Sequence, residues 1–574
     1  MLQFPRFFFK DHSPFNVKSE PQERMMQVIR ATPEEDGLIV APCGSGKSAV
    51  LIEAAMEAGT MVLIFCYEAQ GVHQIVHDLQ EHTTLHDAAI CKYTGKDKDK
   101  ENPHFCYLVT TYGMFAGPES KRSETSKKMR DFVMKTKWDL ICCDEAHHMC
   151  AETYRPMIEK LFAKRKLGFT ATPYRSDCYT VAQDEEEHIK KAFSWFGKVL
   201  VHIPWREVET AGLIARIGRA RVNVELTPEF RAAYTMSAAS QKQYLAALNP
   251  AKLDALVAIC AMHKAFNHGG IVFVTHLVVA NVVQRCLARC LGEGWAVLSG
   301  GSAHGEDETH TPSQNANIVK QFNNGELRGL VCTNVAAGAM DIPDCRFAID
   351  LDTDGGRANM AQRYGRITRT QRVHAKSGES PEDLLARRLE KQKEAWYYDL
   401  VTRDTEDESV AQRRHAFFSS EGYSEEIDMP VDALTGKVGE EGVALPYATL
   451  ANQMALLKEV LQYNALKDVC AGANAAASKA KLPFSAEVKR LEDARDKTPS
   501  AVMKGKYTAA IARAKREQKQ AAEEAKVVRR KTIDNAALNE GALEIFRSLR
   551  LGASVLEEAG LMEVAFAPSD DDEY

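Results

Sequence analysis

The stretch "GLIVAPCGSGKS", residues 37–48, decides the fold of this chain. A short apolar run leads into a glycine-rich loop that ends in Lys47 and Ser48, and a helical pattern follows the loop. In such a loop the glycines let backbone N–H groups close around phosphate oxygens, the lysine supplies a positive charge, and the serine hydroxyl can bind Mg²⁺. The residues predicted to hold the nucleotide phosphates are Pro42, Cys43, Gly44, Ser45, Gly46, Lys47 and Ser48.

Similar apolar runs with polar or glycine residues at their C-terminal ends recur along the chain and alternate with helical patterns. The first group continues through "MVLIFCYE", "CYLVTTYGM", "WDLICCDEAHH" and "KLGFTATP", and a second group reads "GGIVFVTH", "GWAVLSG", "LRGLVCTN" and "CRFAIDLD". This alternation is typical of βαβ units and predicts an α/β protein with two lobes built on parallel sheets. Ligands bind such sheets at the C-terminal ends of the strands.

The pattern also predicts the domain boundaries. We expect an N-terminal segment at 1–17, a first lobe at 18–221, a helical bridge at 222–252, a second lobe at 253–435, and a helical C-terminal extension with an acidic tail at 436–574. Only the first lobe has a phosphate loop.

Composition limits the classes of function. The chain has 574 residues, a mean hydropathy of -0.32 and no apolar run near the roughly 20 residues that cross a bilayer, so we expect no membrane role and see no secretory signal. Its 14 cysteines lack Cys-x-x-Cys spacing, which favours a reducing compartment with "CC" at 142–143 in a buried strand and Cys286 and Cys290 on a helix face.

The formal net charge is -6, but it is unevenly distributed. Residues 479–531 carry sixteen Lys/Arg against seven Asp/Glu, which makes this stretch a basic arm. We leave open whether the arm contacts nucleic acid or is a solvated or protein-binding helical segment.

The motif "DEAH", residues 144–147, directly follows an apolar strand. Asp144 is expected to hold the metal ion through water, and Glu145 to orient and deprotonate the attacking water. His147 and His148 are interpreted as polar coupling or a satisfied surface pair rather than as a zinc site.

These motifs together resemble those of superfamily-two helicases and translocases. In order they read "APCGSGKS", "VTTYGM", "DEAH", "FTATP", "TNVAAGAMDIP" and "QRYGRITR". In "FTATP", the hydroxyls of Thr170 and Thr172 can pass changes at the γ phosphate to other surfaces. Within the group the chain resembles the XPB family, through "GLIARI", "TPEF", "LNPAK" and "YDLVTRDTEDESVAQRRHAFFSSEGYS" as well, over residues 18 to about 430.

The resemblance implies two tandem RecA-like lobes with an ATP cleft between them and an α-helical C-terminal extension. It also implies that Gln22 reads adenine, that Asp341 couples nucleotide to nucleic acid, and that Thr111 and Thr333 touch the strand backbone. Arg175 belongs to the stretch "YRSD", where Ser176 replaces the acid of the Arg-Glu-Asp element of the family, so duplex opening is expected to be altered. We also expect the chain to lack the long N-terminal region of the XPB of TFIIH.

The stretch "NMAQRYGRITRT", residues 359–370, places two arginines in the lobe without a phosphate loop. Arg366 and Arg369 are predicted to reach the γ phosphate as arginine fingers when the lobes close, with Gln362 oriented toward it. The expected activity is ATP hydrolysis with Mg²⁺, coupled to movement on DNA as duplex, fork or bubble.

The family further implies 3′ to 5′ polarity, a role in nucleotide excision repair or promoter opening, TFIIH-type partners, and nuclear localisation if the source is a eukaryote. The alternatives are another superfamily-two motor, such as an RNA helicase, and a catalytically silent XPB-like scaffold.

Overall fold

The structure is a computed structural model. It describes residues 7–463 apart from residues 12, 60, 96–104, 116–122, 152, 173–192, 300–310, 334–341, 343, 353–356, 370–372, 374–378 and 441, and beyond 463 only residues 490, 508, 510–513, 516, 545 and 549. The chain divides into two compact units. Unit one comprises Met1–Val224 and Ala255–Ala444, and unit two comprises Glu225–Asp254 and Leu445–Tyr574.

Unit one contains two parallel sheets of seven strands each. The first sheet has the order β3-β4-β2-β5-β6-β1-β7. Its strands are β1 (Gly37–Val40), β2 (Val62–Cys66), β3 (Ile90–Tyr93), β4 (Tyr107–Thr111), β5 (Trp138–Asp144), β6 (Ala163–Thr170) and β7 (Val199–His202). In-register pairing of Val40 with Thr170 and of Asp144 with Phe169 brings the ends of β1, β5 and β6 to one edge of this sheet.

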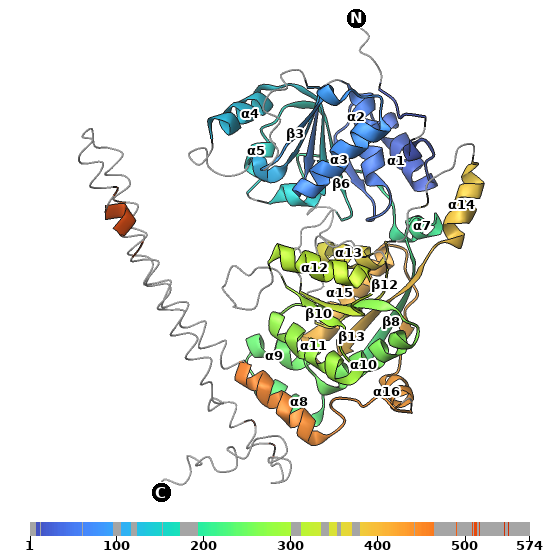
Figure 1. Ribbon diagram of the computed structural model, residues 1–574, viewed down its shortest axis with the longest axis vertical. Helices are drawn as coiled ribbons and strands as arrows, with labels where there is room; N and C mark the ends of the chain where they lie inside the picture. Colours follow the sequence, from blue (N-terminus) through green and yellow to red (C-terminus); the bar gives the residue numbers. More distant parts are fainter. Residues whose placement is uncertain are drawn as a thin grey trace, which may run out of the picture. The chain divides into compact units, whose positions relative to one another are not determined.

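Helices cover both faces of the first sheet (Figure 1). Alternate strand residues point into two separate apolar clusters: Ile64 and Cys142 lie in one, whereas Phe65 and Cys143 lie in the other. The helices are α1 (Glu20–Ala31), α2 (Lys47–Ala58) and α3 (Ala69–His82) over the first cluster, and α4 (Glu124–Lys135) and α5 (Arg155–Ile158) over the second. Short 3₁₀ turns are η1 (Pro14–Asn16), η2 (Asp87–Ala89), η3 (Tyr112–Met114) and η5 (Ala146–Cys150).

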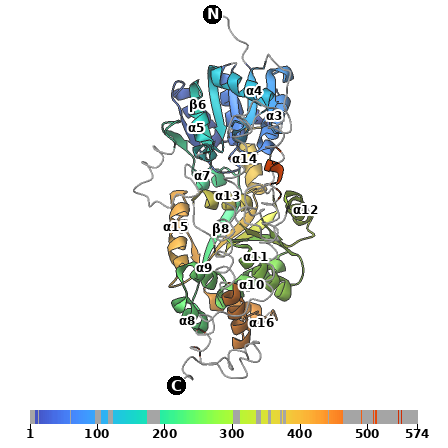
Figure 2. The same cartoon turned by 90° about the vertical axis from the view of Figure 1, so that its left-hand side faces the viewer.

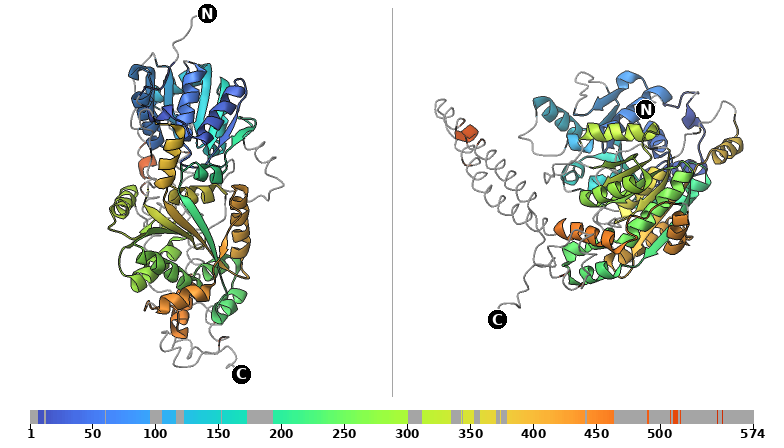
Figure 3. Two further views of the ribbon diagram at one scale, coloured as in Figure 1. Left: turned by 90° about the vertical axis from the view of Figure 1, so that its right-hand side faces the viewer. Right: turned by 60° about the horizontal axis from the view of Figure 1, so that its bottom comes forward.

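The second sheet has the order β10-β11-β9-β12-β13-β8-β14. Its strands are β8 (Arg216–Val224), β9 (Gly269–Val274), β10 (Trp295–Leu298), β11 (Gly329–Thr333), β12 (Cys345–Asp350), β13 (Glu394–Thr402) and β14 (Ile427–Asp428). Helix α15 (Glu406–Ser420) lies on one side of this sheet and α11 (Leu277–Leu291) on the other, as two opposite views show (Figures 2 and 3). The remaining helices of the unit are α7 (Trp205–Thr210), α12 (Pro312–Asn323), α13 (Arg357–Ile367), α14 (Pro381–Glu390) and α16 (Val431–Glu440), and α10 (Pro250–Ala265) runs across the unit boundary.

Numbered within its own lobe, each sheet has the strand order 3-4-2-5-6-1-7. The two lobes therefore share one topology, with β8 in the place of β1, β12 in the place of β5 and β13 in the place of β6. The fold is that of two tandem RecA-like lobes, as the resemblance implied.

Unit two is helical in its described part. It contains α8 (Pro228–Met236) and α9 (Ala239–Ala247), and residues 450–463 are also helical. The backbone N–H of Tyr447 donates to Asp254 Oδ1 at 3.1 Å, and the rings of Tyr244 and Tyr463 lie 5.2 Å apart edge to face. Most of the basic arm, residues 479–531, lies outside the described residues.

Two predicted boundaries differ from the structure. The first lobe was expected to extend to residue 221, but β8 pairs with β13 from Arg216 to Val224 and so belongs to the second sheet. The register of a neighbouring strand more than 170 residues away decides this, and that register is not visible in the local sequence. The boundary at 436 falls inside α16, whereas unit one continues to Ala444.

The predicted placement of four cysteines is confirmed. Cys142 and Cys143 are buried in β5, Cys286 is buried on α11, and Cys290 on the same helix is half-buried. In the described part of the chain, no single helix combines the length and apolar character needed to cross a bilayer, although a bent pair, Gln241–Ala247 with Pro250–Ala265, meets that test jointly.

Candidate active site

The phosphate loop connects β1 to α2 and is built on two glycines in the left-handed region. Gly44 and Gly46 both have φ of +86°, a conformation that side chains disfavour. Lys47 is 8% exposed, and its Nζ donates to the carbonyl oxygens of Ala41 at 2.8 Å and Pro42 at 2.9 Å. The loop lysine therefore folds back over its own loop, where the same ammonium can donate to phosphate oxygens instead.

Gln22 lies directly against this loop. A Cβ added to Gly46 would lie 2.0 Å from Gln22 Nε2, so only glycine allows this approach. Gln22 also caps α1, because its Oε1 accepts hydrogen bonds from Ser19 N at 2.9 Å and Ser19 Oγ at 3.0 Å. The predicted adenine reader is thus held between a helix start and the phosphate loop, with its amide N–H₂ group as the donor still available for a base.

The acid pair follows at the end of β5. Burial and the neighbouring Glu145 raise the pKa of Asp144 to about 7, and Lys47 opposes this rise. Glu145 has φ of +48°, a left-handed conformation that is energetically costly for a residue with a side chain. Such strained residues are found most often at functional sites. The Tyr112 hydroxyl donates to the Asp144 carbonyl at 2.8 Å and helps to fix this turn.

His147 connects three of the motifs. Its Nδ1 lies 3.0 Å from Thr170 Oγ1 and 3.5 Å from Glu145 Oε2, and its Nε2 lies 3.5 Å from Gln362 Nε2 on α13. Thr170 Oγ1 donates to the Thr172 carbonyl, so it accepts from a protonated Nδ1, and Nε2 then accepts from the Gln362 amide. Burial lowers the pKa of His147 to about 4, which keeps the ring neutral.

His147 and His148 were interpreted as polar coupling or as a surface pair. The structure confirms coupling for His147, which is buried. His148 stacks on Tyr67 with ring centroids 3.5 Å apart, and burial lowers its pKa to about 3.

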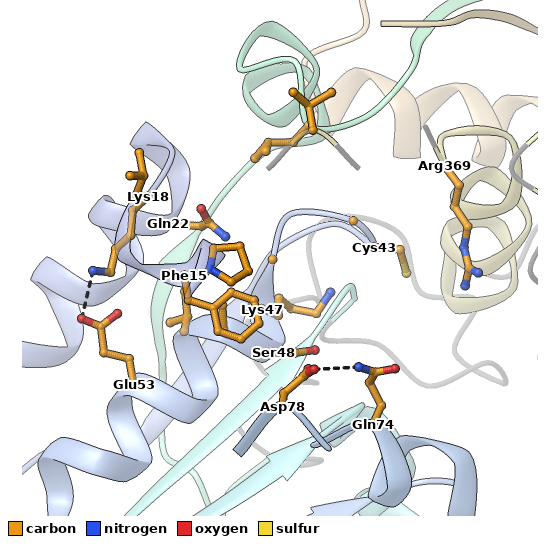
Figure 4. Close-up of a pocket in the computed structure, with 18 of the residues that line it drawn as sticks. Phe15, Lys18, Gln22, Cys43, Lys47, Ser48, Glu53, Gln74, Asp78 and Arg369 are labelled. Carbon is orange, nitrogen blue, oxygen red and sulfur yellow. Dashed lines mark hydrogen bonds and ion pairs between the residues drawn. The ribbon is translucent and has the colours of Figure 1, made fainter. Parts of the chain in front are cut away.

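A cavity of about 350 Å³ joins these parts to the second lobe (Figure 4). From the first lobe it is lined by Pro14, Phe15, Val17, Lys18, Gln22, Cys43, Gly44, Gly46, Lys47, Ser48, Ala49, Val50, Glu53, Gln74, Asp78, Asp144 and Glu145. Gly212 and Leu213, which precede β8, and Arg369, Val373 and Arg388 from the second lobe complete the wall. One loop of one lobe and several side chains of the other thus face the same space.

The predicted arginine fingers take different positions. Arg369 lines the cavity, whereas Arg366 is 7% exposed and lies near the Cys332 thiol, whose pKa is raised by burial and by Cys345 while Arg366 opposes the rise. Gly365 directly precedes Arg366, and a Cβ there would be 3.2 Å from Cys43 Cβ, so the bare glycine lets α13 approach the phosphate loop.

The predicted nucleic-acid contacts lie at strand ends. Thr111 is the last residue of β4 and Thr333 the last residue of β11, and these strands hold the same position in the two sheets. Arg175, Ser176 and Asp341 lie outside the described residues.

Sequence reasoning missed several residues of the cavity wall. Phe15 is part of an N-terminal aromatic cluster and lies seven residues before Gln22. Its closeness in sequence to the predicted adenine reader was the signal that could have identified it. Lys18 pairs with Glu53 at 3.0 Å, and Gln74 donates to Asp78 at 2.7 Å, as Figure 4 shows. Arg388 had no signal, because only the tertiary fold brings α14 to this site.

Two family models match the chain. The model described as type III restriction enzyme, res subunit, matches residues 16–175, and the ERCC3/RAD25/XPB C-terminal helicase model matches residues 208–487. The phosphate loop, the acid pair and the two RecA-like lobes define the class as a superfamily-two helicase. Within that class the chain is similar to the XPB-like helicases.

Curated relatives agree with this assignment. "General transcription and DNA repair factor IIH helicase/translocase subunit XPB" of Drosophila melanogaster is 27% identical over 428 residues, covering 73% of this chain and 49% of that protein. The protein of the same name from Schizosaccharomyces pombe is 28% identical over 432 residues, covering 75% of this chain and 48% of that protein. The chain therefore spans about half the length of the curated relatives it matches.

A solved structure, S. cerevisiae Dbp5 bound to RNA and ADP BeF3, covers 74% of this chain and 94% of that chain at 16% identity, with a TM-score of 0.46.

Proposed function

We propose that this chain is an ATP-dependent DNA translocase or helicase of the XPB type. The observation that carries the proposal is the cavity in which Lys47, Asp144 and Glu145 of the first lobe face Arg369 of the second. A nucleotide bound there would contact both lobes, so binding and hydrolysis would change how strongly the lobes hold together. Hydrolysis would then be coupled to movement along a bound strand.

The residues of the first lobe have separate roles in this proposal. Lys47 and the backbone N–H groups of the loop bind the phosphates, and Glu145 accepts a proton from the attacking water. Gln22 holds the nucleoside at the other end of the cavity.

A divalent cation fits the oxygen donors of this site. Ser48 offers a hydroxyl and Asp144 a carboxylate, both of which Mg²⁺ prefers, and the raised pKa of Asp144 reflects a buried carboxyl that a cation would stabilise in its ionised form. When bound, the cation would neutralise charge on the phosphate oxygens.

The residues of the second lobe complete the site. We assign to Arg369, which lines the cavity, the role of stabilising negative charge on the transferred phosphoryl group, and the same role to Arg366 after closure of the lobes. Gln362 is coupled to Glu145 and Thr170 through His147, whose ring nitrogens contact all three residues.

DNA is the proposed partner, held through phosphate contacts near Thr111, Thr333 and Arg175, with affinity that falls as salt rises. Asp341 is proposed to couple the nucleotide to it. Movement in the 3′ to 5′ direction, a role in excision repair or promoter opening, association with TFIIH-type subunits and nuclear localisation in a eukaryote are proposals from the family.

The test is ATP hydrolysis with duplex DNA, forked DNA, duplex RNA or no nucleic acid. We expect DNA to stimulate turnover, Lys47→Ala to abolish it, and Glu145→Gln to reduce kcat by about 10²- to 10⁴-fold because it removes the general base. Lys164→Ala is the matched control, since Lys164 lies near the start of β6, is 75% exposed and pairs with Asp139 away from the cavity.

Three outcomes would count against the proposal. Hydrolysis indifferent to every nucleic acid would exclude a nucleic-acid motor. Stimulation by RNA but not by DNA would assign the chain to RNA helicases. Absence of hydrolysis in the wild-type protein would leave a silent scaffold.

A further inference from the structure

Arg388 on α14 lies on the wall of the cavity although no motif of the chain includes it. Its neighbour Arg387 forms an ion pair with Glu379, through contacts of 2.8 Å from Nε and 2.5 Å from Nη2. For Arg388 the structure shows no hydrogen bond or ion pair to any residue that it describes. Two adjacent arginines of one helix therefore differ: Arg387 is neutralised by a carboxylate, whereas Arg388 lines the cavity.

The end of α14 is fixed to the linker between the two sheets, residues 203–215. Gln392 Nε2 donates to the carbonyl oxygens of Glu209 at 2.7 Å and Ile214 at 2.6 Å, one on each side of Gly212. Gly212 has φ of +68°, and a Cβ added there would lie 2.9 Å from Arg388 Cβ. The bare backbone at Gly212 thus allows Arg388 to pack closely against the linker at the cavity wall.

The linker meets the cavity on the side of α1. Glu207 on α7 accepts a 2.8 Å ion pair from Arg24, which lies on α1 two residues after Gln22. α7 ends two residues before Gly212. Contacts therefore connect α1 to the linker and the linker to Arg388. The linker also touches the phosphate loop through Ile214, whose Cγ2 would lie 3.0 Å from a Cβ at Gly44.

We propose that Arg388 binds the nucleoside end of the nucleotide and stacks its guanidinium on the base, in the cavity that also contains Phe15 and Gln22. The inference rests on the proposed function, because it takes this cavity to be the ATP site. A planar guanidinium stacks well on aromatic faces, and the interaction gains strength where water is excluded. Burial and Arg387 lower the pKa of Arg388, and Glu379 opposes this, so the cation lies in surroundings that favour a π-rich partner.

Base contact from α14 has a mechanical consequence. Gln392 hydrogen-bonds the end of α14 to the linker. A base bound by Arg388 would therefore restrain the linker as well as the two lobes that line the cavity. ADP, which keeps the base, would therefore retain this contact after the γ phosphate is lost.

The experiment compares Arg388→Ala with Arg387→Ala, using equilibrium binding of ATP, ADP and inorganic triphosphate to the full chain. We expect Arg388→Ala to weaken ATP and ADP binding by about tenfold and to leave triphosphate binding unchanged, because triphosphate has no base. Arg387→Ala should leave all three affinities unchanged. Arg388→Lys, which keeps the charge without the plane, should recover only part of the loss.

Several results would overturn the inference. Equal losses for ATP and triphosphate would make Arg388 a phosphate contact, and unchanged ATP binding would remove it from the site. An equal loss in Arg387→Ala would point to a general disturbance of α14. If the wild-type chain failed to bind ATP at all, the proposed function itself would fail, which a defect confined to Arg388→Ala would not imply.

Discussion

The two sheets of unit one repeat the same strand order, yet different segments follow their corresponding first strands. In the first lobe, β1 is followed at once by the phosphate loop and α2. In the second lobe, β8 occupies the position of β1, and the chain leaves it for Glu225–Asp254, which belongs to unit two. One topology thus supports phosphate binding in one lobe and an inserted segment in the other.

The fifth strand shows the same contrast at the level of single side chains. β5 ends in Asp144, which lines the cavity beside Lys47. β12, its counterpart, ends in Asp350, which is fully buried, accepts a hydrogen bond from the Tyr397 hydroxyl and lies 3.7 Å from Arg363 on α13. The acid at the end of the fifth strand is available for chemistry in the first lobe and anchors the arginine-bearing helix in the second.

Two lobes with the same strand order therefore need not share a function. What matters is whether a side chain at a strand end is left facing a cavity or is paired inside the lobe. The following predictions test this difference between corresponding positions.

The largest expected effect is on stability, from Asp350→Asn. The change removes the carboxylate that lies 3.7 Å from the buried Arg363, which should lower the free energy of unfolding by about 3–5 kcal/mol. Urea unfolding followed by circular dichroism measures it. Glu394→Gln is the control in the same sheet, because its contact with Arg216 is 3.5 Å long and exposed, and it should cost less than about 1 kcal/mol. Equal costs for the two variants would remove the proposed anchoring role.

Asp144→Asn should behave in the opposite way. We expect kcat to fall by about a hundredfold or more, because the proposed metal ligand is lost. Stability at pH 7 should stay equal or rise, because the folded pKa lies above the usual 3.8 and the ionised carboxyl therefore opposes folding as pH rises toward about 7. Hydrolysis assays and thermal melts measure the two effects. A large loss of stability would show that Asp144 stabilises its lobe as Asp350 does, which would contradict the proposed difference between the two strand-end acids.

The smallest expected effect concerns buried histidines, since each lobe has one among its described residues, His147 in the first lobe and His263 in the second. In the second lobe His263 stacks on Phe347 with ring centroids 4.1 Å apart, and its Nε2 lies 2.9 Å from the Tyr398 hydroxyl. Burial and His268 lower the pKa of His263 to about 3, from an unfolded value of 6.5. The stability that the neutral ring contributes is therefore complete above pH 6.5 and is lost as pH falls below it, by about 1–2 kcal/mol between pH 7 and pH 5.

His263→Phe should keep the stacking and remove that part of the acid dependence, measured as the urea midpoint against pH. The exposed His86 serves as the control, since His86→Gln should leave the slope unchanged. An unaltered slope in His263→Phe would assign the acid sensitivity to the first lobe, where burial also lowers the pKa values of His147 and His148.

The parts of this protein that depend on local chemistry could be predicted from its sequence. The phosphate loop could be predicted because Gly44, Gly46 and Lys47 form a contiguous pattern, and both sheets could be predicted because buried parallel strands are short apolar runs. Asp144 and Glu145 were predictable for the same reason, since they end such a run.

Only the tertiary structure decided which distant residues share the cavity. β8 lies in the second sheet because it pairs with β13, and Arg388 reaches the cavity because Gln392 ties α14 to the linker around Gly212. Likewise, Asp350 and Asp144 both look like strand-end acids in the sequence. The partners that separate them, Arg363 and Tyr397 for one and the cavity for the other, come from long-range packing that no local pattern encodes.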